Sequence, residues 1–220
     1  MDLRAFLTKV SIYAIPALLA ITLHEVAHGW VARLFGDRTA EMLGRLSLNP
    51  LRHLDPMGTL VVPGILLAVG GPLIGWAKAV PVATSALRHP RRAMVLVALA
   101  GPAANLLMAA LWCGVLFAIV RVRFTSYETV VTWVELLCEA GIWVNVILAV
   151  FNLLPVPPLD GGRVLAGMLP PRWGRRLERL EPVGLFLVLG LSLLRLLDWI
   201  FEPAFRAMGR LIGVLLGSST

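Results

Sequence analysis

The sequence predicts an all-α, polytopic membrane protein, and two observations lead to this fold class. Of the 220 residues, 58% are hydrophobic and 15% are charged. The apolar residues form long runs, and a soluble domain of this length has too little interior to bury them. Four runs exceed or approach the 20 or so residues that a helix needs to cross a bilayer. We therefore expect a single membrane-embedded domain, residues 1–220, built as a bundle of four to five transmembrane helices.

The four expected spans are residues 10–32, 93–120, 129–154 and 183–201. A fifth apolar run, residues 57–76, contains Pro63, Pro72 and several glycines, which interrupt helices. It is either an additional span or a re-entrant loop that enters the membrane and returns, and we prefer the loop.

The net charge of +7 bears on the orientation in the membrane. If residues 57–76 return, thirteen of the twenty Lys and Arg residues lie on one side, in residues 33–92 and 163–179, and six lie on the other. A full crossing would give a weaker split of about 11 to 8. The positive-inside rule then places both basic stretches in the cytoplasm of a multi-pass cell-membrane protein. The charge is thereby explained without binding of nucleic acid.

The first expected span contains a metal-binding pattern, His24-Glu25-Val26-Ala27-His28. Residues four apart lie on one face of a helix, so the two imidazoles can bind one metal ion. Glu25, next to the first histidine, can act on a water molecule there. The pattern indicates zinc-assisted hydrolysis inside a membrane.

The third span ends in a second motif, Asn152-Leu-Leu-Pro-Val-Pro-Pro-Leu-Asp160-Gly-Gly-Arg163. Its prolines and glycines unwind the helix, and unwound backbone at membrane depth is tolerated where it lines a site. Asp160 is therefore a candidate third ligand, which would give two histidines, one aspartate and one open position, as in catalytic zinc sites. Taken singly, each of these residues could also be a buried polar group or a helix cap.

Together these residues resemble the site-2 protease family of intramembrane zinc metalloproteases. His24 to His28 is similar to the zinc-binding helix of the family. Gly101-Pro-Ala-Ala-Asn105 is similar to its G-x-x-x-N element, and Asn152 to Gly161 to its N-x-x-P-x-x-x-x-D-G element. The chain looks like the compact branch, which has no PDZ or CBS module.

The resemblance implies one Zn²⁺ per chain, held by His24, His28 and Asp160. It implies regulated intramembrane proteolysis, in which peptide bonds within or next to transmembrane segments of membrane proteins are cleaved. Glu25 would be the general base and then the general acid. Asn152 would contact the substrate or the oxyanion, and Asn105 would support the core.

Three further interpretations stay open. The stretch Gly75 to Val82 is either a short edge strand that pairs with an unwound substrate or a simple returning loop. The protein could instead be a metal or solute transporter, although an internal repeat would be typical of that class. It could also be a catalytically inactive membrane scaffold of the same fold.

The remaining polar residues are expected to lie outside the site. Arg195 and Asp198 should pair in the last span, and His53 should lie at the surface of a cytoplasmic loop. Residues 163–179, which include Trp173, should contact anionic headgroups of the lipid bilayer. No pattern indicates an oligomeric state.

Overall fold

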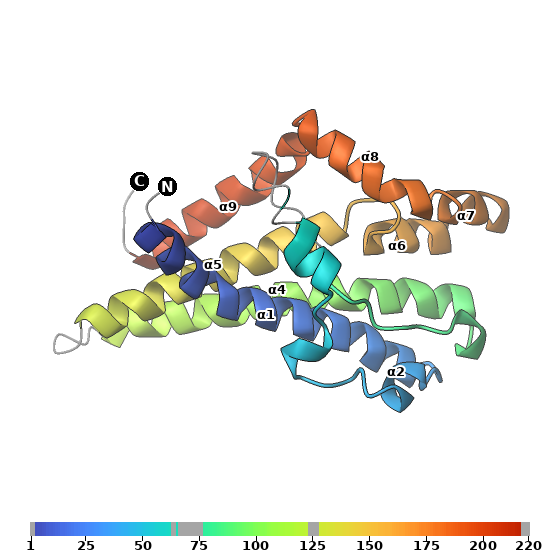
Figure 1. Ribbon diagram of the computed structural model, residues 1–220, viewed down its shortest axis with the longest axis horizontal. Coiled ribbons are helices and arrows are strands. Elements are labelled where there is room, and N and C mark those ends of the chain that lie inside the picture. The colour runs from blue at the N-terminus through green and yellow to red at the C-terminus, as the bar shows by residue number, and fades with distance from the viewer. Residues whose placement is uncertain (1–2, 63–64, 66–76, 123–127, 217–220) are drawn as a thin grey trace.

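The centre of the molecule is a bundle of three long helices (Figure 1). The computed structural model describes residues 3–62, 65, 77–122 and 128–216, and their regular elements are all helices. The central helices are α1 (Leu3–Leu34), α4 (Pro90–Val122) and α5 (Glu128–Asn152), and each packs against the other two.

The length and composition of these three helices suit a bilayer. Val10–Leu34, Pro90–Arg121 and Thr129–Asn152 are each apolar enough and long enough to cross one. At about 1.5 Å per residue, each exceeds the hydrocarbon thickness of about 30 Å. The all-α, polytopic membrane class is therefore confirmed, with three helices of spanning length in the described part of the chain.

Small side chains allow the three helices to approach closely. Ala20, Ala98 and Ala149 are buried at the contacts, whereas large residues such as Leu107 and Leu111 face outward. Lipid tails are as apolar as leucine, so association in a membrane depends on close packing and polar contacts rather than on hiding large apolar residues.

The connection from α1 to α4 starts and ends at the same end of the bundle. Helix α1 is closed by Gly36, whose φ is 104°, and by a hydrogen bond from Asp37 N–H to the Ala32 carbonyl at 3.0 Å. Before α4, the Arg88 N–H donates to the Phe35 carbonyl at 2.8 Å. The returning-loop interpretation of residues 57–76 requires this arrangement. Most of that run, residues 63–64 and 66–76, lies outside the described residues, so the interpretation stays a prediction.

The described part of this connection consists of short helices and extended chain. The short helices are α2 (Thr39–Met42), η1 (Pro50–Arg52), η2 (Pro56–Val61) and η3 (Thr84–Ala86). Residues 77–83 between η2 and η3 form no strand in the described structure. The Lys78 N–H donates to the His53 carbonyl at 2.9 Å, and Arg45 donates to the Lys78 carbonyl at 2.8 Å. Gly75 and Trp76, the start of the expected edge, lie outside the described residues.

Beyond α5 the described residues 153–216 form four helices that lie along the bundle (Figure 1): α6 (Asp160–Met168), α7 (Pro171–Glu178), α8 (Glu181–Leu193) and α9 (Asp198–Leu216). The stretch 183–201, predicted as one span, is divided between α8 and α9 by a turn in which Arg195 has a φ of 58°. The 13 residues of α8 cover about 20 Å, less than a bilayer core. The predicted pair is present, with Arg195 Nε 3.1 Å from Asp198 Oδ2, but on this exposed turn.

Helix α9 packs back onto the bundle. Its Ile212 is buried in a cluster with Leu116 of α4 and with Cys138 and Ile142 of α5. This contact holds α9 on α4 and α5. Helix α4 carries Asn105, and α5 leads into the turn that precedes Asp160.

Candidate metal centre

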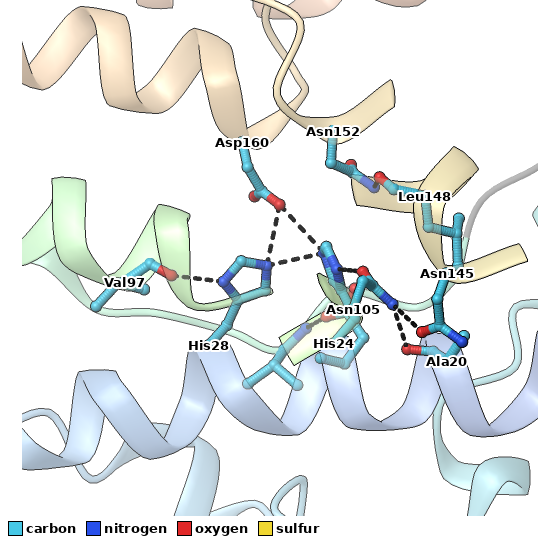
Figure 2. A network of polar contacts seen from close by, with 11 residues as sticks. Ala20, His24, His28, Val97, Asn105, Asn145, Leu148, Asn152 and Asp160 are labelled. Carbon is cyan, nitrogen blue, oxygen red and sulfur yellow. Dashed lines mark hydrogen bonds and ion pairs between the residues drawn. The ribbon is translucent and has the colours of Figure 1, made fainter. Parts of the chain in front are cut away.

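Three side chains from distant parts of the sequence meet at one point of the bundle (Figure 2). His24 and His28 project from α1, and Asp160 is the first residue of α6. The two Nε2 atoms are 3.0 Å apart, and Asp160 Oδ2 lies 3.1 Å from that of His24 and 3.2 Å from that of His28. All three residues are buried, with exposed fractions of 7%, 7% and 5%. The helix spacing and the second motif therefore converge as the sequence predicts.

The other nitrogen of each imidazole faces an acceptor. His24 Nδ1 lies 2.6 Å from Asn105 Oδ1, and His28 Nδ1 lies 2.6 Å from the Val97 carbonyl oxygen. Carbonyl oxygens only accept, so both Nδ1 atoms carry the proton. In the neutral rings the Nε2 atoms are then unprotonated, and their lone pairs point at each other and at Asp160.

This arrangement fits a zinc ion. Two lone pairs and a carboxylate oxygen at these distances repel one another unless a cation lies between them. Asp160 Oδ2 is buried and has no hydrogen-bond partner among the described residues, which leaves it free to bind that cation. A tetrahedral zinc site with bonds of about 2.0–2.1 Å separates its donors by about 3.3 Å, close to the observed triangle. Histidines whose Nδ1–H is held by an oxygen are typical of metal ligands.

Gly101 leaves room beside the two histidines. A Cβ atom at this position of α4 would lie 2.5 Å from His24 Cε1 and 2.5 Å from His28 Nε2. Any side chain here would push against both imidazoles. The glycine of the G-x-x-x-N element thus lets α4 pack directly on the face of α1 that carries His24 and His28.

Two glycines shape the turn that carries Asp160. A Cβ at Gly161 would overlap the Leu153 carbonyl, and one at Gly162 would overlap the backbone at Pro157. Because these neighbours are main-chain atoms, they cannot move aside as a side chain could. The Asp-Gly-Gly sequence is therefore required for α6 to start this close to the end of α5.

Glu25 lies on α1 beside the three donors but makes a different contact. Its Oε2 accepts a hydrogen bond from the backbone N–H of Val80 at 2.8 Å. Within the described part of the chain this is the only hydrogen bond of its carboxylate, so Oε1 is left for another donor. The extended segment 77–83 thus passes directly beside the candidate base.

The two predicted asparagines occupy different positions. Asn105 is fully buried and bonded to His24. Asn152 is half-buried, and its Nδ2 donates to the Leu148 carbonyl of its own helix at 2.9 Å, with no bond to the three donors within the described structure. Asn105 is thereby brought to the site, whereas Asn152 lies at its edge.

Asn145 was not predicted to lie at the site, and the prediction that His53 lies at the surface was wrong. Asn145 on α5 is fully buried and accepts a hydrogen bond from Asn105 Nδ2 at 3.0 Å. Its position two helical turns before Asn152, within an apolar span, was an available signal. His53, expected at the surface, is also fully buried, because its Nε2 donates to the Ser47 carbonyl at 2.8 Å and its backbone anchors Lys78.

Comparison with known proteins bears on this site. The sequence model described as "Peptidase family M50" matches residues 117–194. The protein named "Putative zinc metalloprotease YwhC" of Bacillus subtilis is 37% identical over 193 residues, which cover 88% of this chain and 85% of that protein. The chain belongs to peptidase family M50. Proteins named "Putative zinc metalloprotease Rip2" match this M50 chain as well. Those of Mycolicibacterium smegmatis and Mycobacterium tuberculosis are 35% and 36% identical over 190 residues, covering 86% of the chain and 69% of each relative.

Membership of M50, the site-2 protease family, confirms the resemblance and the enzyme class that it implies. This M50 member is an intramembrane zinc metalloprotease, and zinc is its metal. A multi-pass location follows from the family together with the three apolar helices. No solved structure matches the chain significantly.

Proposed function

We propose that His24, His28 and Asp160 hold the zinc ion and that Glu25 moves the protons of peptide hydrolysis. The substrate is a peptide bond within or next to a transmembrane segment of another membrane protein. The observation that carries this proposal is the group of three buried donor atoms, which all lie within 4.8 Å of one another. When bound, zinc supplies a Lewis acid that polarises the scissile carbonyl and activates water for attack at neutral pH.

Glu25 is the general base and then the general acid. It takes the proton of the attacking water and later delivers it to the leaving amine. The contact with Val80 supports this role because it holds Oε2 and leaves Oε1 to receive the proton. A carboxylate that is held in place through one oxygen can use the other oxygen to accept a proton from a water molecule at a fixed position.

The substrate has to be extended before it is cut. A helical peptide hides its carbonyls in main-chain hydrogen bonds, whereas an extended one can pair with the backbone of another segment. Residues 77–83 are extended and lie beside Glu25, so we assign them this holding role.

Asn152 is our candidate for the oxyanion contact. One N–H of its Nδ2 is used by the Leu148 carbonyl, and the second N–H remains for a substrate oxygen. Asn105 supports the site through His24 rather than through the substrate.

The metal centre faces the cytoplasmic half of the membrane in our proposal. Both basic stretches adjoin the end of the bundle where α1 ends and α6 begins. Helix α7 carries exposed arginines, and the Arg176 guanidinium lies 4.9 Å from the ring centre of Trp173, which is 57% exposed. Arg and Trp together are typical of the headgroup region of the cytoplasmic leaflet. The basic surface therefore serves the bilayer and not a nucleic acid.

Elemental analysis combined with a cleavage assay tests the proposal. Detergent-purified wild type, Asp160→Ala and Glu25→Gln are dialysed, and their zinc content and their turnover of a transmembrane-peptide substrate are measured. We expect one zinc per chain in the wild type, much less in Asp160→Ala, and full zinc without cleavage in Glu25→Gln.

The same variants separate the rival classes. A transporter would keep its transport in Glu25→Gln, because proton transfer to a leaving amine plays no part in it. A scaffold would bind zinc in the wild type without cleaving any substrate. Zinc that is unaffected by Asp160→Ala would remove Asp160 from the ligand set.

A further inference from the structure

We infer that Asn145 is a positioning residue of the metal centre, although it makes no hydrogen bond to any of the three donors. It fixes the amide of Asn105, which in turn fixes the tautomer and orientation of the His24 ring. Figure 2 shows the three side chains in line, from Asn145 through Asn105 to His24. The inference rests on the proposed zinc site.

The first support is the burial of both amides. Asn105 and Asn145 are each 0% exposed, and they come from α4 and α5. An amide in an apolar bundle is costly unless its polar atoms are bonded, and polar groups at membrane depth are functional candidates. These two amides are bonded to each other and to their surroundings, so they form one connected network rather than two isolated groups.

The second support is the direction in which each amide must point. Asn145 Nδ2 lies 2.8 Å from the Gly141 carbonyl, which can only accept, so the nitrogen faces Gly141 and Oδ1 faces Asn105. Asn105 Nδ2 then donates to Asn145 Oδ1 at 3.0 Å and to the Ala20 carbonyl at 3.2 Å.

These assignments determine the state of His24. With its nitrogen committed to two acceptors, Asn105 presents Oδ1 to His24 Nδ1 at 2.6 Å. Nδ1 must therefore carry the proton, and Nε2 is left with the lone pair that a metal ion needs. Asn145 supplies one of the two acceptors that keep Asn105 in this orientation, so its removal loosens the amide and the ring.

The third support is a contrast between the two histidines. His28 Nδ1 is held by the Val97 carbonyl, a main-chain group that no side-chain substitution removes. His24 depends on side chains from two other helices. The proposed positioning role therefore concerns one of the two histidine ligands, and the other histidine is independent of it.

The test is a double-mutant cycle on zinc affinity. Zinc dissociation constants of wild type, Asn145→Leu, Asn105→Leu and the double variant are measured by competition with a chromophoric chelator. We expect Asn145→Leu to bind zinc about tenfold more weakly, the lower end of the range for residues that orient metal ligands. In the Asn105→Leu background the second substitution should add nothing, because Asn145 acts through Asn105. An unchanged affinity in Asn145→Leu, or an equal loss in both backgrounds, would overturn the inference.

Asn152→Leu is the matched control for the affinity of zinc. Asn152 lies on the same helix and makes the same bond to the carbonyl four residues earlier, but it has no bond to Asn105 within the described structure. We expect zinc affinity close to that of the wild type. A loss as large as that of Asn145→Leu would mean that any apolar substitution in α5 weakens the site, which would refute the specific role.

A measurement on the unmodified protein covers the case in which Asn145→Leu does not fold. The chain has four histidines, so nitrogen NMR of histidine-labelled, zinc-loaded protein gives few signals. We expect His24 to be protonated at Nδ1, and an unprotonated Nδ1 would contradict the inference. Wild-type protein that binds no zinc would instead refute the proposed function, so the two failures are distinguishable.

Discussion

The backbone N–H of Val80 donates to the carboxylate of Glu25 at 2.8 Å, across 55 residues of sequence. This contact ties residues 77–83, a segment of the α1–α4 connection, to the residue that we propose as general base. The segment therefore has two proposed roles, orientation of Glu25 and pairing with the substrate, and the contact allows them to be tested separately.

Replacing Val80 with proline removes the N–H that holds Glu25. We expect kcat to fall by about tenfold or more with an unchanged KM and unchanged zinc content, because the base is disoriented but substrate and metal still bind. Val82→Pro is the comparison, since the Val82 N–H makes no hydrogen bond within the described part of the chain. Equal losses in both variants, with a raised KM, would favour substrate pairing over orientation of Glu25.

Gly101→Ala should abolish stable zinc binding. The new methyl group would lie 2.5 Å from His28 Nε2, which forces α4 and α1 apart or rotates both imidazoles. Gly114→Ala in the same helix is the control, because a Cβ at Gly114 meets no atom of the described residues within 4 Å. Alanine is the better helix former by about 1 kcal/mol, so this control should keep its zinc and unfold at an equal or higher temperature. Full zinc content in Gly101→Ala would show that the helices can yield there.

Asp37 should make stability depend on pH in the acid range. Burial by itself would raise the pKa of Asp37, but hydrogen bonds from the Thr39 hydroxyl, the Thr39 N–H and the Ala83 N–H outweigh it and lower the pKa. The unfolded chain therefore binds more protons at this residue, so its stabilisation is present above the unfolded pKa of about 4 and is lost as the pH falls through the folded value.

Asp37→Asn should be less stable than the wild type at pH 7, and the difference should shrink as the pH falls below about 4. Thermal unfolding in detergent between pH 3 and pH 7 gives the comparison. A difference between the two proteins that does not change with pH would mean that the charge of Asp37 does not contribute.

Cysteine labelling should place Ala83 and Arg121 on opposite sides of the membrane. Ala83 lies near the contact between Arg88 and Phe35, at the end where α1 finishes, and Arg121 lies at the far end of α4. In a chain whose native Cys113 and Cys138 are replaced, we expect Ala83→Cys to react only from the cytoplasm and Arg121→Cys only from outside. The reverse result would invert our orientation and move the metal centre to the outer half.

The sequence predicted that His24, His28 and Asp160 would lie together because most of the signals involved are local. The spacing of His24 and His28 follows from helix geometry alone, and the unwinding before Asp160 follows from proline and glycine chemistry. The depth at which they meet follows from counting spans. The three donors that the structure brings together are accordingly those that the sequence nominated.

The features that were missed depend on which faces of the helices meet. In the sequence, Asn145 looks like any other polar residue of a span, and only the packing of α4 against α5 shows its contact with Asn105. In the sequence, His53 looks like an exposed loop residue, and its burial becomes apparent only in the folded chain. The break between α8 and α9 is also tertiary in origin. Hydropathy continues through residues 194–197, but Leu197 turns in to pack with Val188 and Leu154.

The order of the three donors along the chain also has a consequence for biosynthesis. His24 and His28 leave the ribosome early, whereas Asp160 emerges only after α4 and α5 have been made. A nascent chain that stops before α6 contains the two imidazoles without the carboxylate. The donor cluster is thus completed only after the third long helix has been made.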